Sequence, residues 1–465
     1  MPDEILFSEF DLIYLTYSSL QREIMFPFRI RRRKFKTRML SSFLVLSVIL
    51  TFWMARQEFS YSQQKNQSNK EWNECVAKIQ SDPSIELSNT TLISDDDNIY
   101  QTYRTKECPS IVQEYFSHPP PTQSELEFPI AFSISVYKSA SLLEKLLQAI
   151  YMPQNLYCIH IDMKSTPTFC AAVTELIRCL PNVLLAKKSV DVIYPHISIL
   201  HAQFNCMEDL LYTGKDWKYM INLVGQDFPL YNNRELVLAL RALNGKNNIQ
   251  SFHHPDLKRR TQYAYEFKRR MDGSDHKAYK PVKTYRKKSP PPYNITLFKG
   301  ANHVGLTKGF VEYIIFNQTA RDFIDWLSDT RSPPETFYSS LQQHPGVPGG
   351  VIGLQPEFVM RAIDWFDKEK DEANYECHGK WVRQICWISV RDLRWVLGWN
   401  KRNMLFVQKI PFDVSEDLLR CLSIARERRV YGSYFFMTRT NFSDTSYLRS
   451  DVEKEMMERH ESVVT

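Results

Sequence analysis

An alternation of apolar runs and amphipathic stretches after Phe128 constrains the fold of this chain most strongly. Four runs rich in β-branched and aromatic residues predict strands: FPIAFSISVY, NLYCIHID, NVLLAKKS and WKYMINLVGQDFP. Between them, apolar residues spaced three and four apart predict helices in LLEKLLQAI, TFCAAVTELIRCL and SILHAQFNCMEDLLYT. Strands that alternate with helices of this length form right-handed β-α-β units on a largely parallel sheet, so we expect an α/β domain.

Several polar residues follow the predicted strands, at the edge where a parallel sheet binds its ligands. Asp162 ends the second strand, Tyr194 follows the third, and the sequence GQD at residues 225–227 follows the fourth. The chain contains neither the G-x-G-x-x-G fingerprint nor a G-x-x-x-x-G-K-[ST] loop. These two absences argue against a dinucleotide-binding domain and against a P-loop domain.

Near the N-terminus, a basic run precedes an uncharged apolar segment. Residues 29–38 carry seven Lys and Arg and no acid, and Met39–Ala55 has 17 residues without a charge. As a helix this segment is about 25 Å long, which suits a thin membrane of the early secretory pathway. The positive-inside rule puts residues 1–38 in the cytosol and the rest in the lumen, as a single-pass type II protein with a signal anchor. The competing interpretations are a buried core helix and a cleaved signal peptide.

A lumenal location gives meaning to the sequons and the cysteines. Sequons for N-glycosylation occur at Asn66, Asn89, Asn294 and Asn441. The nine cysteines are expected to be mostly oxidised, and the odd number leaves at least one free or paired between chains. No Cys/His spacing in the sequence suggests structural zinc.

Composition divides the remaining chain into three parts. Residues 56–127 are polar and predict a partly extended stem, residues 128–430 form the predicted body, and residues 431–465 form a polar tail. The net charge is +6, but without residues 29–38 the chain has 52 cations against 53 anions, so we expect no nucleic-acid partner. Residues 255–293 are basic and rich in tyrosine. They predict either a solvated loop or surface hairpin, or a flap that contacts an anionic or sugar ligand.

A stem and a lumenal α/β domain behind a signal anchor are the layout of Golgi glycosyltransferases, and lumenal lectins and sulfotransferases share it. A more specific set of motifs occurs in order over about residues 70–425: AIYMPQNLYCIHID, FNCMEDL, WKYMINLVGQDFPL, SPPETF, CHGKWVRQICW with DLRW, and LFVQK. Together they resemble the core-2/I-branching β-1,6-N-acetylglucosaminyltransferase family. The resemblance implies a GT-A-like catalytic domain over residues 128–430 that uses a UDP-sugar donor and no metal cofactor.

Inverting sugar transfer from UDP needs a carboxylate to deprotonate the acceptor hydroxyl and positive charge to neutralise the departing diphosphate. No D-x-D closes a predicted strand, since Asp95–Asp97 lies in the predicted stem. The resemblance therefore implies that Arg383, in CHGKWVRQIC, and Lys409, in LFVQK, take the place of a metal. It implies that Glu335, in SPPETF, is the general base. The alternatives are ordinary surface cations and a glutamate that caps or begins a helix.

Further site residues carry over from the family by position. On the donor side, besides Arg383 and Lys409, they are Ser135, Val136, Tyr137, Asp162, Met163, Lys164 and Tyr194. Lys258 and Glu335 are implied to contact the acceptor. The alternatives are a helix cap for Asp162 and a core or surface role for Tyr194. Gln250, Gln408 and Val224 depart from the family pattern, which has an acidic residue, Asn and Cys at these positions.

The resemblance also implies four disulfides, Cys75–Cys421, Cys108–Cys179, Cys158–Cys206 and Cys377–Cys386, and leaves Cys170 over. It implies a Golgi enzyme that forms a β-1,6 branch by moving GlcNAc from UDP-GlcNAc to the 6-hydroxyl of GalNAc in a core O-glycan of a glycoprotein. Two alternatives stay open from the sequence. One is the same fold with UDP-glucose or UDP-xylose as donor, and the other is a lumenal glycan-binding protein without transferase activity.

Overall fold

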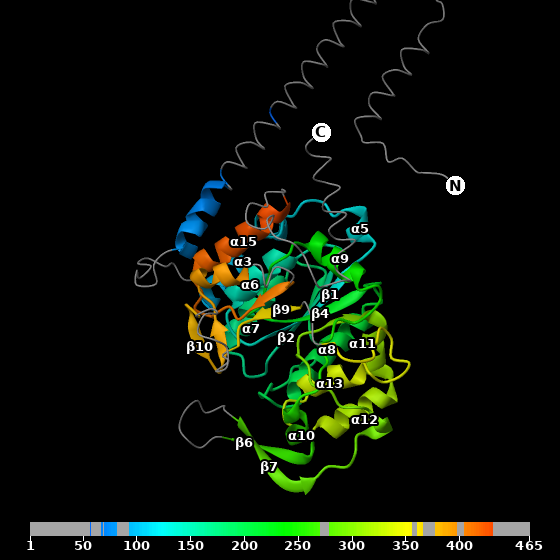
Figure 1. Cartoon of the computed structure of the whole chain (residues 1–465). Coiled ribbons are helices and arrows are strands. Elements are labelled where there is room, and N and C mark those ends of the chain that lie inside the picture. The colour runs from blue at the N-terminus through cyan, green and yellow to red at the C-terminus, as the bar shows by residue number, and fades with distance from the viewer. Residues whose placement is uncertain are drawn as a thin grey trace, which may run out of the picture. The chain divides into compact units, whose positions relative to one another are not determined.

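A computed structural model describes residues 56, 67, 69–80, 93–269, 279–355, 360–365, 377–397 and 404–430 (Figure 1). Residues 1–70 and 71–465 form two separate units, and the fold described below is that of the second. The predicted cytosolic tail, signal anchor and C-terminal tail lie outside the described residues, as do Asn66, Asn89 and Asn441. Within the described ranges, no helix has both the length and the apolar character needed to cross a membrane.

A five-stranded sheet is the centre of the fold and confirms the predicted α/β class. Its strands are β1 (Ile130–Val136), β2 (Leu156–Ile161), β3 (Val183–Leu185), β4 (Tyr219–Val224) and β8 (Gly305–Thr307), in the order β3-β2-β1-β4-β8. The first four are parallel, and β8 pairs antiparallel with β4. The four predicted strands all form, so the carboxyl ends of β1, β2 and β4 meet at one edge of the sheet.

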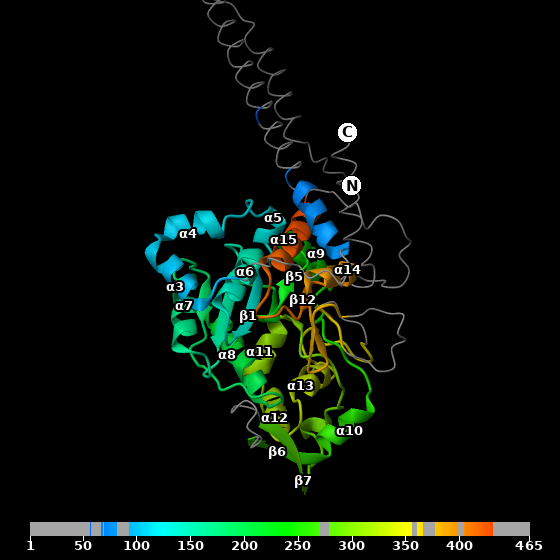
Figure 2. The same cartoon turned by 90° about the vertical axis from the view of Figure 1, so that its left-hand side faces the viewer.

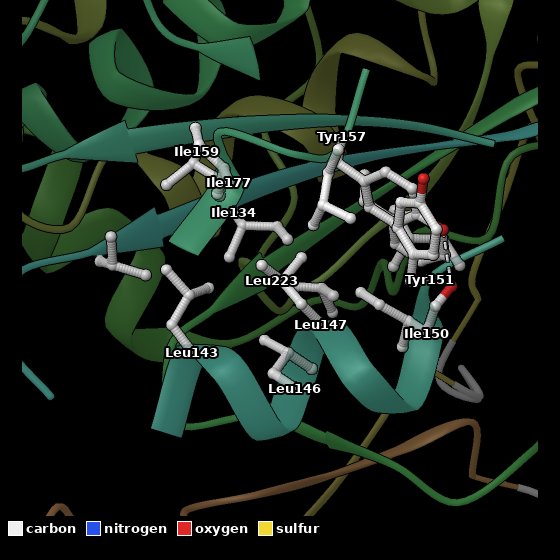
Figure 3. Packing of buried hydrophobic residues seen from close by; sticks show 14 of the residues in the cluster. Ile134, Leu143, Leu146, Leu147, Ile150, Tyr151, Tyr157, Ile159, Ile177 and Leu223 are labelled. Carbon is white, nitrogen blue, oxygen red and sulfur yellow. Dashed lines mark hydrogen bonds between the residues drawn. The ribbon is translucent and has the colours of Figure 1, made fainter. Parts of the chain in front are cut away.

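Helices cover both faces of this sheet, because alternate residues of each strand are apolar on both sides. One face packs against α6 (Ala140–Ile150) and α7 (Pro167–Ile177). Figure 3 shows Leu143, Leu146 and Leu147 of α6 lying against Ile134 and Leu223 of the strands. The three leucines follow the spacing of three and four that predicts the helix from the sequence.

The opposite face shares an apolar cluster with four helices. They are α8 (Ser198–Tyr212), α11 (Lys308–Phe316), α12 (Gln318–Leu327) and α13 (Pro334–Leu341). The segment between α8 and α11 contains α9 (Asn233–Ala242), α10 (Pro255–Thr261), the hairpin of β6 (Tyr263–Arg269) with β7 (Tyr279–Lys287), and the short helix η1 (Pro292–Asn294). Figure 2 shows α13, α12 and the β6–β7 hairpin following one another away from the sheet.

A small second sheet brings the C-terminal part of the body to the end of β4. Strand β12 (Phe406–Gln408) lies between β5 (Phe228–Pro229) and β9 (Arg361–Ile363). A third apolar cluster joins this sheet to the elements between β9 and β12 and to the helix that follows β12. These elements are the hairpin of β10 (Lys380–Val382) with β11 (Ile385–Trp387), the short helices η2 (Val390–Asp392) and α14 (Leu393–Val396), and α15 (Glu416–Val430).

Residues 96–126 differ from the partly extended stem expected from their polar composition. They form α3 (Asp96–Thr105), α4 (Cys108–Tyr115) and α5 (Gln123–Leu126), which pack on the body. The apolar residues of α3 and α4 explain the difference, because they are spaced along one helix face and join the core beside α7. Tyr103 is fully buried and donates a hydrogen bond to Glu144 of α6 at 2.6 Å.

The structure contains the four disulfides that the resemblance implies. Cys75–Cys421 ties the helical residues before the body to α15, and Cys108–Cys179 ties α4 to the end of α7. Cys158–Cys206 joins β2 to α8, and Cys377–Cys386 closes the β10–β11 hairpin. Among the described cysteines Cys170 is the one without a disulfide.

Candidate active site

Two of the predicted donor-side groups lie at the carboxyl ends of neighbouring strands. The Asp162 N–H donates to the Val136 carbonyl at 2.9 Å, so the end of β2 is fixed beside the end of β1. The buried Asp162 carboxylate accepts from the backbone and side-chain nitrogens of Lys164, both at 2.9 Å. The helix that follows is capped by Thr166 instead, which removes the helix-cap alternative for Asp162. Met163, next to this ion pair, is 66 % exposed.

Aromatic contacts connect the end of β1 to the C-terminal part of the site. Tyr137 meets the ring of Phe412 edge-on with 5.2 Å between centroids, and Phe412 meets Trp387 in the same way at 5.9 Å. The Lys409 Nζ lies 5.7 Å from the centroid of Trp387. The donor-side residues that follow β1 and the predicted cation after β12 therefore belong to one continuous surface.

Arg383 stands at the tip of the β10–β11 hairpin. Val382 pairs with Ile385, so Arg383 and Gln384 form a two-residue turn with φ values of 50° and 68°. Residues other than glycine rarely adopt a positive φ, and such backbone strain concentrates at functional sites. The Cys377–Cys386 disulfide closes the hairpin and holds this tip in place.

Lys409 is close enough to Arg383 for the two charges to repel. Burial lowers the pKa of Lys409, the positive charge of Arg383 lowers it further, and the Asp227 carboxylate opposes both effects. The Ile388 N–H donates to the Lys409 carbonyl at 3.0 Å, which joins this position to the end of β11. The exposed Arg383 and the partly buried Lys409 thus put two positive charges near each other, as an anion-binding site requires.

A buried ion pair lies near Lys409 and includes Asp227, the carboxylate that acts on the pKa of Lys409. The Asp227 and Arg361 side chains are completely buried, and the Arg361 Nε lies 3.1 Å from the Asp227 Oδ1. The Val224 N–H donates to the other Asp227 oxygen at 2.7 Å. The neighbouring Gln226 carbonyl accepts from the Ile410 N–H at 3.0 Å. The GQD turn after β4 thus fixes the backbone on the C-terminal side of Lys409.

Glu335 lies in the first turn of α13, and its carboxylate points to another element. The Glu335 Oε2 accepts from an Nη of Arg260 at 2.6 Å, and Arg260 also pairs with Asp256. The backbone is fixed too, because the Gly300 N–H donates to the Glu335 carbonyl at 2.8 Å. A Cβ at Gly300 would lie 1.9 Å from the Gln250 carbonyl oxygen, so only glycine allows this close approach beneath α13.

Tyr194 lies near both the candidate base Glu335 and the predicted cation Arg383. Partial burial raises the pKa of its hydroxyl, and the negative charge of Glu335 raises it further, while the positive charges of Arg260, Arg383 and Arg331 oppose the shift. Tyr194 as a whole residue is 61 % exposed. The Ser332 N–H donates to the Pro195 carbonyl at 3.1 Å, which ties the loop after Tyr194 to the loop before Glu335. A group bound at Tyr194 would therefore have both a carboxylate and several cations near it.

Comparison of the sequence with known proteins identifies the family. The sequence profile of the Core-2/I-Branching enzyme family matches residues 130–397. This chain belongs to the core-2/I-branching family. It is 38 % identical over 354 residues, which are 74 % of this chain and 81 % of the relative, to beta-1,3-galactosyl-O-glycosyl-glycoprotein beta-1,6-N-acetylglucosaminyltransferase 4 of Danio rerio.

Two human relatives of the core-2/I-branching family carry different acceptor names. N-acetyllactosaminide beta-1,6-N-acetylglucosaminyl-transferase is 37 % identical over 66 % of this chain and 74 % of the relative. Beta-1,3-galactosyl-O-glycosyl-glycoprotein beta-1,6-N-acetylglucosaminyltransferase 3 is 36 % identical over 71 % of this chain and 75 % of the relative. Membership of the family therefore does not by itself specify the acceptor.

The structure brings most of the family-implied residues of this chain to one region. Ser135 and Val136 end β1, and Lys258 is an exposed residue of α10, the helix that also carries Arg260. The Asp95–Asp97 segment is occupied elsewhere, because Asp95 caps α3 and Asp96 accepts from the Ala140 N–H at 2.7 Å.

Four groups at the site were not predicted from the sequence. They are Arg260, Arg331, the Asp227–Arg361 pair and Phe412. The GQD sequence had drawn attention to the turn that contains Asp227, but no local pattern indicates its partner 134 positions later. One group of potential metal ligands lies close together in the described part, Cys377, Cys386 and Asp392, and its two sulfurs form the hairpin disulfide.

Proposed function

We propose that this chain transfers GlcNAc from UDP-GlcNAc to the 6-hydroxyl of GalNAc in core O-glycans of glycoproteins and so forms β-1,6 branches. The family supports a glycosyltransferase with a nucleotide-sugar donor and a glycan acceptor. The observation that carries the proposal is that the Glu335 carboxylate and the Arg383 cation both lie near enough to the Tyr194 hydroxyl to act on its pKa, and that Arg383 acts on Lys409 in the same way. An acceptor hydroxyl and a departing diphosphate need these two kinds of group on opposite sides of the reacting carbon.

In the proposed reaction Glu335 is the general base. Its Oε2 is held by Arg260, and its Oε1 makes no hydrogen bond within the described residues, so this oxygen is available to the acceptor hydroxyl. The acceptor oxygen attacks the anomeric carbon of the donor while Glu335 takes its proton. The bond from that carbon to the diphosphate breaks, the electron pair leaves with UDP, and the configuration of the anomeric carbon is inverted.

Arg383 and Lys409 neutralise the departing UDP in this proposal. The negative charge of the diphosphate would reduce the repulsion between the two cations. It would also favour the charged form of Lys409, which burial disfavours. Each charge-assisted contact is worth about 1.5–3 kcal/mol. We therefore propose that transfer needs no metal ion.

The donor nucleoside is proposed to bind at the carboxyl edge of the GT-A-like sheet. Ser135, Val136 and Tyr137 would contact it from β1, and the segment Asp162, Met163 and Lys164 from β2, with Tyr194 stacking on the ring. Tyr137 and Met163 expose 47 % and 66 % of their surfaces there. Lys258 of α10 is proposed to contact the acceptor beside Glu335.

The cellular setting is proposed from the sequence and the family. A signal anchor at Met39–Ala55 would hold the protein in the Golgi membrane as a type II protein, with residues 128–430 as the lumenal catalytic domain and Asn66, Asn89, Asn294 and Asn441 as sites for N-glycans. The disulfides agree with an oxidising compartment.

A transfer assay with purified protein tests the proposed function. UDP-GlcNAc, UDP-glucose and UDP-xylose are each offered with Galβ1-3GalNAc and with N-acetyllactosamine, in EDTA and in Mn²⁺. We expect transfer from UDP-GlcNAc to Galβ1-3GalNAc in EDTA, with the new sugar β-linked to O6 of GalNAc. Transfer from another donor, or only to N-acetyllactosamine, would contradict the proposed substrates. Transfer that requires Mn²⁺ would contradict the role of Arg383 and Lys409, and UDP binding without any transfer would favour a glycan-binding protein.

A further inference from the structure

The β6–β7 hairpin concentrates positive charge beside the candidate site. Residues 255–293 contain twelve Lys and Arg and four Asp and Glu, whereas the chain as a whole has 59 against 53. We call the described residues 263–268 and 279–287 the basic hairpin. Its exposed cations are Lys268, Lys280, Lys283, Arg286 and Lys287.

Few acidic groups compensate this charge. Lys268 lies 3.4 Å from Glu266, but both side chains are more than 60 % exposed, so the pair is weak. Asp329 pairs with Arg286 and with Lys288 at the foot of the hairpin. Within the described ranges no acidic group lies within ion-pair distance of Lys280 or Lys287. Tyr285, between these cations, is fully exposed, so the hairpin presents aromatic and positively charged side chains to solvent.

The foot of the basic hairpin is fixed to the elements that carry the candidate base. The Tyr265 hydroxyl donates to the Arg259 carbonyl at 3.0 Å, next to the residue that binds Glu335. The Tyr265 N–H donates to the Asp329 carbonyl at 2.8 Å. Phe267 meets His196, two residues after Tyr194, with 4.7 Å between ring centroids. A molecule that is bound at Glu335 and continues outward therefore has the hairpin beside it.

The size of the hairpin indicates what kind of molecule it meets. The nine residues of β7 span about 30 Å, several times the length of one sugar ring. Figure 1 shows the hairpin extending past α10 and α12, away from the five-stranded sheet. A two-stranded hairpin also has an outer edge on each strand, whose free N–H and C=O groups suit an extended peptide.

We propose that the basic hairpin binds an acidic stretch of the polypeptide that carries the acceptor glycan. This inference rests on the proposed function, because the glycan has to be held at Glu335 while its peptide lies along the hairpin. Carboxylates of the peptide would pair with Lys280, Lys287 and their neighbours. The hairpin would thereby select among glycoproteins that carry the same glycan.

Two glycopeptides with identical Galβ1-3GalNAc groups test the inference. One carries glutamates on both sides of the glycosylated residue, and the other carries glutamines. The free disaccharide is a third acceptor. Two exposed ion pairs, with Lys280 and Lys287, give an expected preference in kcat/KM of roughly twofold to thirtyfold for the acidic glycopeptide, which should decline as salt is added.

A double variant, Lys280→Gln with Lys287→Gln, should lose most of this preference and keep the rate with the free disaccharide. The matched control is Lys246→Gln, an exposed lysine four residues after the end of α9, which should keep the preference. Figure 1 shows α9 far from the hairpin, at the other end of the view.

Each of the other outcomes contradicts either the role of the hairpin or the proposed function. Equal kcat/KM for the two glycopeptides, or a preference that survives in the double variant, contradicts the role of the hairpin. Binding to phosphatidylserine vesicles that needs Lys280 and Lys287, without a peptide preference, would assign the hairpin to a membrane and overturn the proposal. Absence of transfer to the free disaccharide by the wild type contradicts the proposed function instead.

Discussion

Replacing Asp227 by asparagine should strongly destabilise the body of the protein. Asp227 and Arg361 are both fully buried, with 3.1 Å between the Oδ1 and the Nε. The other Arg361 nitrogens donate to the carbonyls of Met360 and Asn222, and the guanidinium lies 4.7 Å from the centroid of Phe406. The Arg361 guanidinium is therefore not solvated by water when its partner loses its charge.

The expected loss follows from this burial. An amide has the shape of the carboxylate but leaves a buried guanidinium without a counter-charge, which costs about 3–5 kcal/mol. Domains are stable by only about 5–15 kcal/mol, so this loss is a large share of the total. If the free energy of unfolding falls by about 3 kcal/mol per molar urea, the midpoint of unfolding should decrease by roughly 1–1.7 M.

Urea unfolding of the wild type and of Asp227→Asn, followed by circular dichroism, measures this shift. The control is Asp216→Asn, because Asp216 is 75 % exposed and pairs with the partly exposed Lys218, so its loss should cost less than about 1 kcal/mol. A double variant, Asp227→Leu with Arg361→Met, removes both charges and should recover much of the stability. A midpoint for Asp227→Asn equal to that of the control would refute the reasoning.

Three further predictions concern the site and the pH dependence of stability. Arg383→Ala should lower kcat/KM about tenfold to a hundredfold and weaken UDP binding, because one charge-assisted contact to the diphosphate is lost; titration with UDP checks this, and unchanged affinity would contradict it. Serine in place of both Cys377 and Cys386 should lower the free energy of unfolding by about 2–3 kcal/mol and weaken UDP binding as well, since the hairpin tip is released; a loss of stability with full UDP affinity would separate the disulfide from the site. Burial and the charge of Arg426 lower the pKa of His118 to about 4. The unfolded chain therefore binds a proton that the folded chain does not, so stability should fall as the pH decreases from 6.5 towards 4. His118→Gln should reduce this slope in urea midpoints measured at each pH, and an identical slope would exclude His118 as its source.

The local pattern of the sequence is sufficient to predict the central sheet. Leu143, Leu146 and Leu147 repeat every three or four residues, and the strands on either side are apolar on both faces, so each element is specified by its own residues. The carboxyl edge followed from this topology, which is why Asp162 and the GQD turn were expected near the site. The disulfides came from the family resemblance and not from spacing.

Polar composition misled the prediction where a few apolar residues decide the structure. Residues 96–126 are polar on average, but Ile99, Tyr103, Ile111 and Phe116 lie in the core and hold the helices on the body. A segment with a low mean hydropathy can still have one apolar helix face that is buried. The periodic spacing of these residues was the available signal.

Long-range polar partners at the site could not be inferred from local patterns. Arg260 is one of several basic residues in a stretch without a clear period, and its pairing with Glu335 depends on how α10 and α13 meet in space. The same holds for Asp227 and Arg361, which come from the turn after β4 and the start of β9. Such contacts are set by packing between distant segments, which no spacing rule encodes.

Glu335→Gln tests the central claim most directly, when the transfer rate and the binding of UDP are measured on the same preparation. Asp256 continues to compensate Arg260 in this variant, so the fold should persist. Glu312→Gln, at an exposed position of α11, is the control and should behave as the wild type. We expect kcat to fall about a hundredfold or more while the Kd for UDP changes less than about twofold. Transfer by Glu335→Gln at the rate of the control would contradict the assignment of Glu335 as the general base.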